Sequence, residues 1–94
     1  MIKTFKVGAE TITVRTDTAL AETSGNVGVY VDSSGLIVID GTASKEAQES
    51  AFCEELTHCL LIKCGRDNLT QDHTLVRPFS EFLFQVLKQG GFFK

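Results

Sequence analysis

The uninterrupted stretch 51–62, AFCEELTHCLLI, constrains the fold of this chain most strongly. It contains no glycine or proline, and it is followed closely by Gly65, a residue that commonly ends helices in the left-handed conformation. Upstream, Ser44 is a good N-cap, and Glu46 would lie in the first turn, where a negative charge is favoured. We therefore predict a helix over residues 45–64.

One stripe of this predicted helix carries three titratable side chains among small and apolar ones. At 100° per residue the stripe is roughly 100° wide, and it comprises Ala47, Ala51, Glu54, Glu55, His58, Ile62 and Gly65. We expect the stripe to be buried. Burying two carboxylates and an imidazole without partners would cost several kcal/mol. The pattern therefore favours either a bound metal ion or a solvated cleft at this face.

The composition limits the class of protein. Ninety-four residues predict a single domain, residues 1–94. A net charge of -3 without a basic run argues against nucleic acid as a partner, and no segment approaches the ~18 apolar residues that a membrane span needs. No signal-type apolar run follows the N-terminus, and the three cysteines form no CxxC pair. We therefore expect a cytoplasmic protein with reduced thiols and no membrane partner.

Alternating and β-branched segments predict two β-hairpins. The first pairs residues 2–7 with 11–15, and the second pairs 27–31 with 36–39 across the turn residues 32–35, where Gly35 suits a positive φ. Residues 36–39 are apolar on both faces, which predicts a central or doubly covered strand. Residues 17–26 are polar with scattered apolar residues, so they form either a loop or a short helix.

A second helical pattern precedes Gly90-Gly91, with apolar residues at Leu75, Val76, Phe79, Phe82, Leu83 and Val86. Pro78 implies that this helix either starts near Arg77 or kinks at the proline. We expect the apolar tail at 92–93 to pack back on the core. The order of elements predicts an α+β fold, a small antiparallel sheet of two β-hairpins packed against two helices.

Glu54 and His58 are four residues apart, so their side chains leave the helix one turn apart on the same side. A helix offers two ligands to one metal ion at this spacing, as in the His-Glu-x-x-His motif, and Glu55 has the place of the general base in that motif. The chain has one other histidine, His73. The three cysteines do not share one helical face, and we interpret them as small buried hydrophobic residues.

These features resemble the small ImmA/IrrE-type metallopeptidase-like proteins of bacteria and phages. The resemblance runs from about residue 27 to residue 89. Its elements are the hairpin that ends in Ile39-Asp40, a helix start at 44–46, the motif helix, and a second helix of Val-x-x-Phe-x-x-x-Leu type that begins at Val76. The family places His-Glu-x-x-His on the first helix and a third ligand, commonly Glu, near the start of the second.

The resemblance implies a minimal zincin-like domain with an altered ligand set. Glu54 replaces the family's first His, and His73 replaces the Glu, so the implied zinc ligands are Glu54, His58 and His73. Asp72 and Thr74 are alternatives for the third ligand. Glu55 would then be the catalytic base, and the edge strand of the hairpin around residues 30–39 would hold an extended peptide substrate.

Two hypotheses about function follow. The first is a zincin-like metal-binding domain that acts as a metal-dependent peptidase on a peptide or regulatory protein, with zinc as its cofactor. The alternative is a catalytically silent phage or mobile-element accessory protein that binds a host or regulatory protein. In the second case Glu54 is a solvated helix carboxylate, Glu55 a surface residue, His58 a core histidine and His73 an exposed one. The sequence points to no particular oligomeric state.

Overall fold

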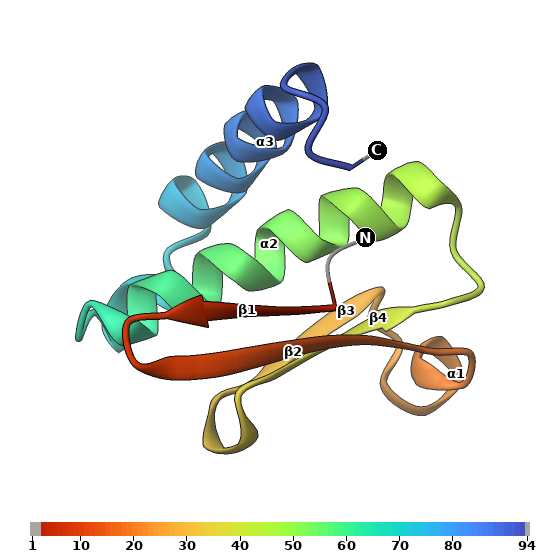
Figure 1. The fold of residues 1–94 in the computed structure, drawn as a ribbon, viewed down its shortest axis with the longest axis horizontal. Helices are drawn as coiled ribbons and strands as arrows, with labels where there is room; N and C mark the ends of the chain where they lie inside the picture. The colour runs from red at the N-terminus through yellow and green to blue at the C-terminus, as the bar shows by residue number, and fades with distance from the viewer. Residues whose placement is uncertain (1–2, 94) are drawn as a thin grey trace.

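The computed structural model describes residues 3–93 and shows an α+β fold built from a four-stranded sheet and three α-helices (Figure 1). The strands are β1 (Thr4–Val7), β2 (Glu10–Asp17), β3 (Gly28–Val31) and β4 (Leu36–Asp40). The helices are α1 (Leu20–Ser24), α2 (Lys45–Lys63) and α3 (His73–Gln89), with short 3-10 turns η1 (Asp32–Ser34) and η2 (Asp67–Gln71). The structure therefore confirms the predicted α+β class.

Both predicted hairpins form, but the sheet that they build is mixed rather than antiparallel throughout. The strand order is β1-β2-β4-β3, and β2 pairs with β4 in parallel, while β1 pairs with β2 and β3 with β4 in antiparallel fashion. The parallel pairing arises because the connection through α1 leads to β3, one position beyond β4, and β4 then returns between β2 and β3. The predicted start of the first strand at Ile2 lies outside the described residues. The segment 17–26, left open between loop and helix, contains α1.

The second hairpin places an apolar strand at the centre of the sheet. β4 lies between β2 and β3, and its residues Ile37, Val38 and Ile39 are buried, as predicted from their apolar character on both faces. Gly35 has a φ of 59° in the turn before β4, a conformation that costs glycine little. After β4, the Asp40 carboxylate accepts hydrogen bonds from the backbone N–H and hydroxyl of Thr42, which turns the chain toward α2.

The helices form layers on the sheet. α2 packs against β3 and β4, and α3 packs mainly on α2, on the side away from the strands (Figure 1). α2 is therefore covered on two sides, by the sheet and by α3. The short helix α1 packs beside β4. Among residues 3–93 there is no helix with the length and apolar character needed to cross a membrane.

The ends of α2 follow the prediction, and of the two alternatives for α3 the start near Arg77 is wrong, since the helix begins earlier and runs through Pro78. Ser44 caps α2 by accepting from the backbone N–H of Ala47 at 3.1 Å, and Gly65 follows the helix with a φ of 74°. α3 begins at His73, not near Arg77, because the Asp72 carboxylate caps it by accepting from the backbone N–H of Thr74. Pro78 consequently lies inside α3.

The hydrophobic core is centred on the fully buried ring of Phe52. The C-terminal Phe92 and Phe93 pack on this ring at centroid distances of 6.2 and 6.1 Å, which confirms that the tail returns to the core. Cys53 and Cys59 are buried free thiols, as predicted. The prediction was wrong for Cys64, which is exposed because it follows the last turn of α2.

Candidate functional site

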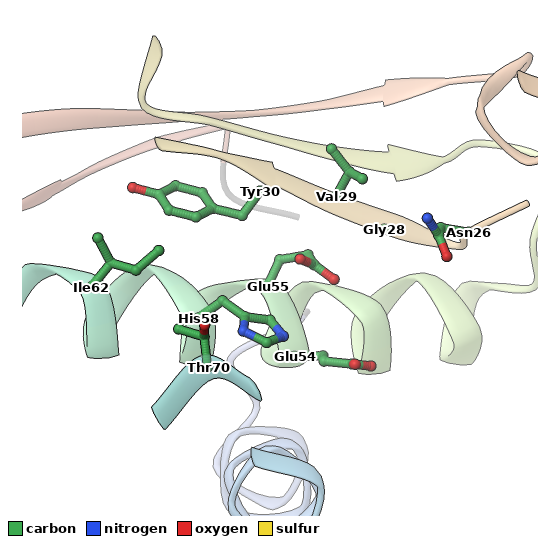
Figure 2. Close-up of a pocket in the computed structure, with 9 residues that line it drawn as sticks. All are labelled: Asn26, Gly28, Val29, Tyr30, Glu54, Glu55, His58, Ile62 and Thr70. Atoms are coloured by element: carbon green, nitrogen blue, oxygen red, sulfur yellow. The ribbon is translucent and has the colours of Figure 1, made fainter. Parts of the chain in front are cut away.

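A cleft of about 400 Å³ opens between the edge strand β3 and helix α2 (Figure 2). α2 contributes acidic and imidazole groups to one wall, β3 contributes backbone and an aromatic ring to the other, and η2 contributes a hydroxyl. The lining residues are Asn26, Gly28, Val29, Tyr30, Glu54, Glu55, His58, Ile62 and Thr70. The structure thus brings together three of the four predicted site residues, namely Glu54, Glu55 and His58.

Glu55 is the most deeply placed charged group of the cleft. Its residue is 9% exposed, and its carboxyl group points toward β3, as Figure 2 shows. Burial, followed by the neighbouring charge of Glu54, raises the pKa of Glu55 from 4.5 to about 7, against a hydrogen bond from the backbone of Tyr30 that lowers it. A carboxyl group with this pKa exchanges its proton near neutral pH.

The backbone group that meets Glu55 comes from the free edge of the sheet. The carbonyl of Val27 accepts from the N–H of Asp40 at 2.7 Å, and antiparallel pairing alternates the direction of successive residues. Gly28 and Tyr30 therefore direct their backbone groups away from β4. The Tyr30 N–H therefore points outward from the sheet edge and donates to the Glu55 carboxyl group. Glu55 consequently pairs with one donor of this strand edge and leaves the carbonyls of Gly28 and Tyr30 without a strand partner.

Gly28 makes the close approach between strand and helix possible. A Cβ atom at Gly28 would lie 3.1 Å from Cγ and 3.3 Å from Oε2 of Glu55, and 3.3 Å from Cβ of Ala51. The close approach of Glu55 to this glycine was not predicted from the sequence. The available signal was a glycine within the predicted strand 27–31, whose other residues are valines and a tyrosine, since such a glycine often marks a site where another group approaches closely.

Tyr30 lines the cleft with its ring, but its hydroxyl group is committed elsewhere. The hydroxyl donates to the Asp32 carboxylate at 2.8 Å, and burial together with this bond raises the pKa of the phenol. The hydrogen bonds from Tyr30 and Lys63 lower the pKa of Asp32. Lys63 also contacts Glu10 at 2.6 Å. This network connects the end of α2 to the sheet. Because the Tyr30 hydroxyl takes part in it, Tyr30 contributes only its ring to the lining of the cleft.

The predicted buried stripe on α2 is only partly buried. Ala51 and Glu55 are buried and His58 is half-buried, but Glu54 and Gly65 are exposed. The stripe lies at the margin of the buried surface because α2 packs against the sheet on one side and α3 on another. Glu54 consequently lies at the cleft rim, as Figure 2 shows. Of the two carboxylates that were expected to be buried, only Glu55 lies inward, whereas Glu54 faces outward.

His73 does not join the cleft. It is exposed as the first residue of α3, and the alternatives for the third ligand, Asp72 and Thr74, bond to each other in the α3 cap. A catalytic zinc ion needs three protein ligands. Residues 3–93 contain no group of three or more His, Cys, Asp or Glu side chains arranged to hold a metal ion. The residues therefore do not assemble the predicted zinc site, and zinc binding stays a prediction.

The chemistry of the cleft suits a positively charged ligand. Two carboxyl groups line it, one buried and one at the rim, and the imidazole of His58 lies one turn further along α2 (Figure 2). Entry of a cation would favour the charged form of the buried Glu55 carboxyl group.

Comparisons with protein-family models, curated proteins and solved structures gave no significant match. The resemblance to ImmA/IrrE-type proteins therefore remains a prediction from the sequence.

Proposed function

We propose that this chain is a protein-binding domain whose cleft between β3 and α2 receives a Lys or Arg side chain of a partner protein. The observation that carries this proposal is that Glu54, Glu55 and His58 line one cleft of about 400 Å³ beside an edge strand. This proposed function corresponds to the alternative hypothesis from the sequence, a catalytically silent accessory protein that binds a host or regulatory protein.

The charge state of the cleft supports a cationic side chain as the ligand. Glu55 is held partly protonated near neutral pH by burial and by Glu54. An ammonium or guanidinium group that displaced this proton would pair with the buried carboxylate, and charge-assisted hydrogen bonds of this kind are among the stronger ones. The exposed Glu54 at the rim would attract the same group during its approach.

The edge strand supports an extended peptide as the carrier of that side chain. β3 is a terminal strand of the sheet, and the carbonyls of Gly28 and Tyr30 face away from β4 by the alternation described above. An extended segment can add to such an edge by main-chain hydrogen bonds, while its alternate side chains enter neighbouring pockets. The cleft beside β3 would then select the charged side chain of the segment.

The test is a titration of isotopically labelled protein with the peptide Thr-Val-Lys-Val-Thr and with its norleucine counterpart. We expect the lysine peptide to shift the amide signals of Gly28, Val29 and Tyr30. We expect Glu55→Gln to weaken binding about tenfold, the equivalent of 1.4 kcal/mol. Glu81→Gln, an exposed acidic residue on α3, is the matched control. Equal binding of both peptides, or shifts confined to other surfaces, would contradict the proposal.

A zincin-like metal-dependent peptidase is the second candidate. The observation that favours it is that Glu54 and His58, the two i, i+4 residues, line the same cleft as Glu55. Elemental analysis after gentle purification tests this candidate, with His58→Ala as the variant that should lose the ion. Stoichiometric zinc, together with peptide cleavage that Glu55→Gln abolishes while zinc is retained, would favour the peptidase. Absence of zinc from the purified protein would remove it.

A further inference from the structure

The outer edge of β3 directs backbone groups toward an incoming segment at two residues, Gly28 and Tyr30. The carbonyl of Val27 accepts from Asp40 of β4, so the alternation of antiparallel strands turns the next residue and Tyr30 away from β4. The Tyr30 N–H donates to the Glu55 carboxyl group, whereas the Tyr30 carbonyl is directed outward. An incoming segment therefore meets three main-chain groups, namely the N–H and carbonyl of Gly28 and the carbonyl of Tyr30.

Gly28 leaves open the space that a side chain would occupy above α2. A Cβ atom at this position would lie 3.3 Å from Cβ of Ala51 and 3.1 Å from Cγ of Glu55, so a side chain here would point toward the helix. In an antiparallel pair, residues directly opposite each other lie on the same face of the sheet, with their Cα atoms about 5.5 Å apart when they are hydrogen-bonded. A partner residue opposite Gly28 would therefore direct its own side chain toward α2. The flexible four-carbon stem of a lysine would carry its ammonium group to Glu55.

The position opposite Tyr30 has apolar surroundings. The Tyr30 ring and Ile62 lie at one end of the cleft, and Asn26 lies at the other (Figure 2). The Tyr30 hydroxyl is bonded to Asp32, so the ring is the part of this side chain that a cross-strand neighbour would contact. Aromatic and β-branched side chains stabilise such cross-strand pairs. An apolar side chain of the partner is therefore favoured opposite Tyr30.

The three main-chain groups of the edge favour an antiparallel segment. Such a segment bonds all three with a stretch of three residues, because one residue exchanges two bonds with Gly28 and another donates to the Tyr30 carbonyl. A parallel segment needs five residues, since its bonds come from the neighbours of the residue directly opposite. Ordering fewer residues costs less conformational entropy. In the antiparallel direction, the residue opposite Tyr30 comes two positions before the residue opposite Gly28.

We propose that the partner segment runs antiparallel to β3, with its Lys or Arg opposite Gly28 and an apolar residue two positions earlier opposite Tyr30. This inference rests on the proposed function, and it gives the partner the pattern apolar-x-Lys or apolar-x-Arg. The basic residue exchanges two main-chain hydrogen bonds with Gly28 while its side chain enters the cleft. There it meets the buried carboxyl group of Glu55 and the exposed one of Glu54.

Two isomeric peptides with acetylated and amidated ends test the direction and the register. They are Thr-Ile-Thr-Lys-Thr-Thr-Thr, with isoleucine two residues before the lysine, and Thr-Thr-Thr-Lys-Thr-Ile-Thr, with isoleucine two residues after it. Titrations of the isotopically labelled whole chain should show about fivefold tighter binding of the first peptide. Ile62→Ala should bring this ratio close to one. Val31→Ala is the control and should keep the ratio, because Val31 is 36% exposed and its side chain lies on the other face of the sheet from Tyr30.

Backbone N-methylation of the first peptide tests the main-chain hydrogen bonds. In the proposed arrangement the lysine N–H donates to the Gly28 carbonyl, whereas the N–H of the residue after the lysine points away from β3. N-methylation of the lysine should therefore weaken binding about tenfold, and N-methylation of the following threonine should leave it unchanged. A parallel segment would give the reverse result, because the residue after the lysine would then donate to Gly28.

The outcomes separate this inference from the proposed function. Equal binding of the two isomers, tighter binding of the second, or the reverse effect of N-methylation would overturn the direction and register, while binding of lysine peptides at β3 would still stand. Failure of both peptides to shift the amide signals of Gly28, Val29 and Tyr30 would overturn the proposed function and this inference with it.

Discussion

Gly28 of β3 and Glu55 of α2 lie so close together that a side chain at position 28 would force its neighbours to shift by a few tenths of an ångström. A Cβ atom at Gly28 would be 3.1 Å from Cγ of Glu55 and 3.3 Å from its Oε2. The glycine therefore lets the carboxyl group reach the edge of the sheet, where the Tyr30 N–H donates to it. The depth of the cleft, and with it the raised pKa of Glu55, depends on this contact.

Gly28→Ala should destabilise the protein, because the added methyl group must displace the Glu55 side chain or move the strand away from α2. We expect a loss of about 1–2 kcal/mol in the free energy of unfolding, as for other overpacked sites. Urea denaturation measures it. Gly41→Ala is the matched control, since a Cβ there would have its nearest neighbour at 3.4 Å, an ordinary contact. Equal stability of the two variants would contradict the role assigned to Gly28.

Glu55→Gln should change how stability depends on pH. The pKa of Glu55 is raised from 4.5 to about 7 in the folded protein, so the fold favours the protonated carboxyl group. The wild type should therefore lose stability as pH rises from about 4.5 to 7, by an amount of the order of 3 kcal/mol if the full shift is expressed. Glutamine cannot ionise, and it can still accept from the Tyr30 N–H. The variant should be more stable than the wild type at pH 8 and about equally stable at pH 4.

Thermal melts at a series of pH values measure this difference, and Glu54→Gln separates its two causes. Burial is the larger cause of the shift, and the charge of Glu54 is the second. Glu54→Gln should consequently narrow the pH range over which stability falls without abolishing the effect. A wild type whose stability does not fall between pH 5 and pH 7 would contradict a raised pKa at Glu55.

Local signals in the sequence predicted most of the secondary structure of this fold. The turn residues 32–35 and the cap at Ser44 place the second hairpin and α2 correctly, since their chemistry acts within a few residues. The parallel pairing of β2 with β4 was not predicted. It joins strands that are separated along the chain by α1 and β3, and no local pattern specifies such a pairing. Pro78 left two alternatives for α3, a start near Arg77 or a kink at the proline, and the cap at Asp72 starts the helix before the proline.

The candidate site was predicted in part for a similar reason. A helical wheel finds the inward face of a helix when one side is buried, but α2 is buried by the sheet on one side and by α3 on another. The stripe that carries Glu54, Glu55 and His58 therefore lies at the margin of the buried surface, where it forms a cleft. The prediction of a solvated cleft as the alternative to a metal ion came from the cost of burying these groups. The place of His73 depends on the packing of α3, which its sequence spacing does not specify.

Phe93→Ala should be strongly destabilising, although Phe93 is close to the C-terminus. The Phe93 ring is 7% exposed and packs edge-on against Phe52 at a centroid distance of 6.1 Å and against Phe92 at 5.1 Å. Truncation of a buried phenylalanine costs about 3–5 kcal/mol, so guanidinium denaturation should show a loss near the lower end of this range. Phe93→Leu keeps most of the volume and should lose less than half as much. Wild-type stability in Phe93→Ala would show that the tail does not belong to the core.

Lys88→Met should destabilise the protein, because Lys88 of α3 is the partner of a buried carboxylate, Glu49 of α2. Glu49 of α2 has a side chain that is 3% exposed, and its Oε1 is 2.5 Å from Nζ of Lys88 on α3, whose own side chain is 47% exposed. Removal of the ammonium group leaves a buried carboxylate without its partner, which should cost about 2 kcal/mol. Urea denaturation at neutral pH measures this cost. The double variant Glu49→Gln/Lys88→Met should recover most of it, because the neutral amide is cheaper to bury than the unpaired charge. If the double variant were as unstable as the single one, the loss would come from packing of the lysine stem, and the ion pair would not be what joins α2 to α3 at this point.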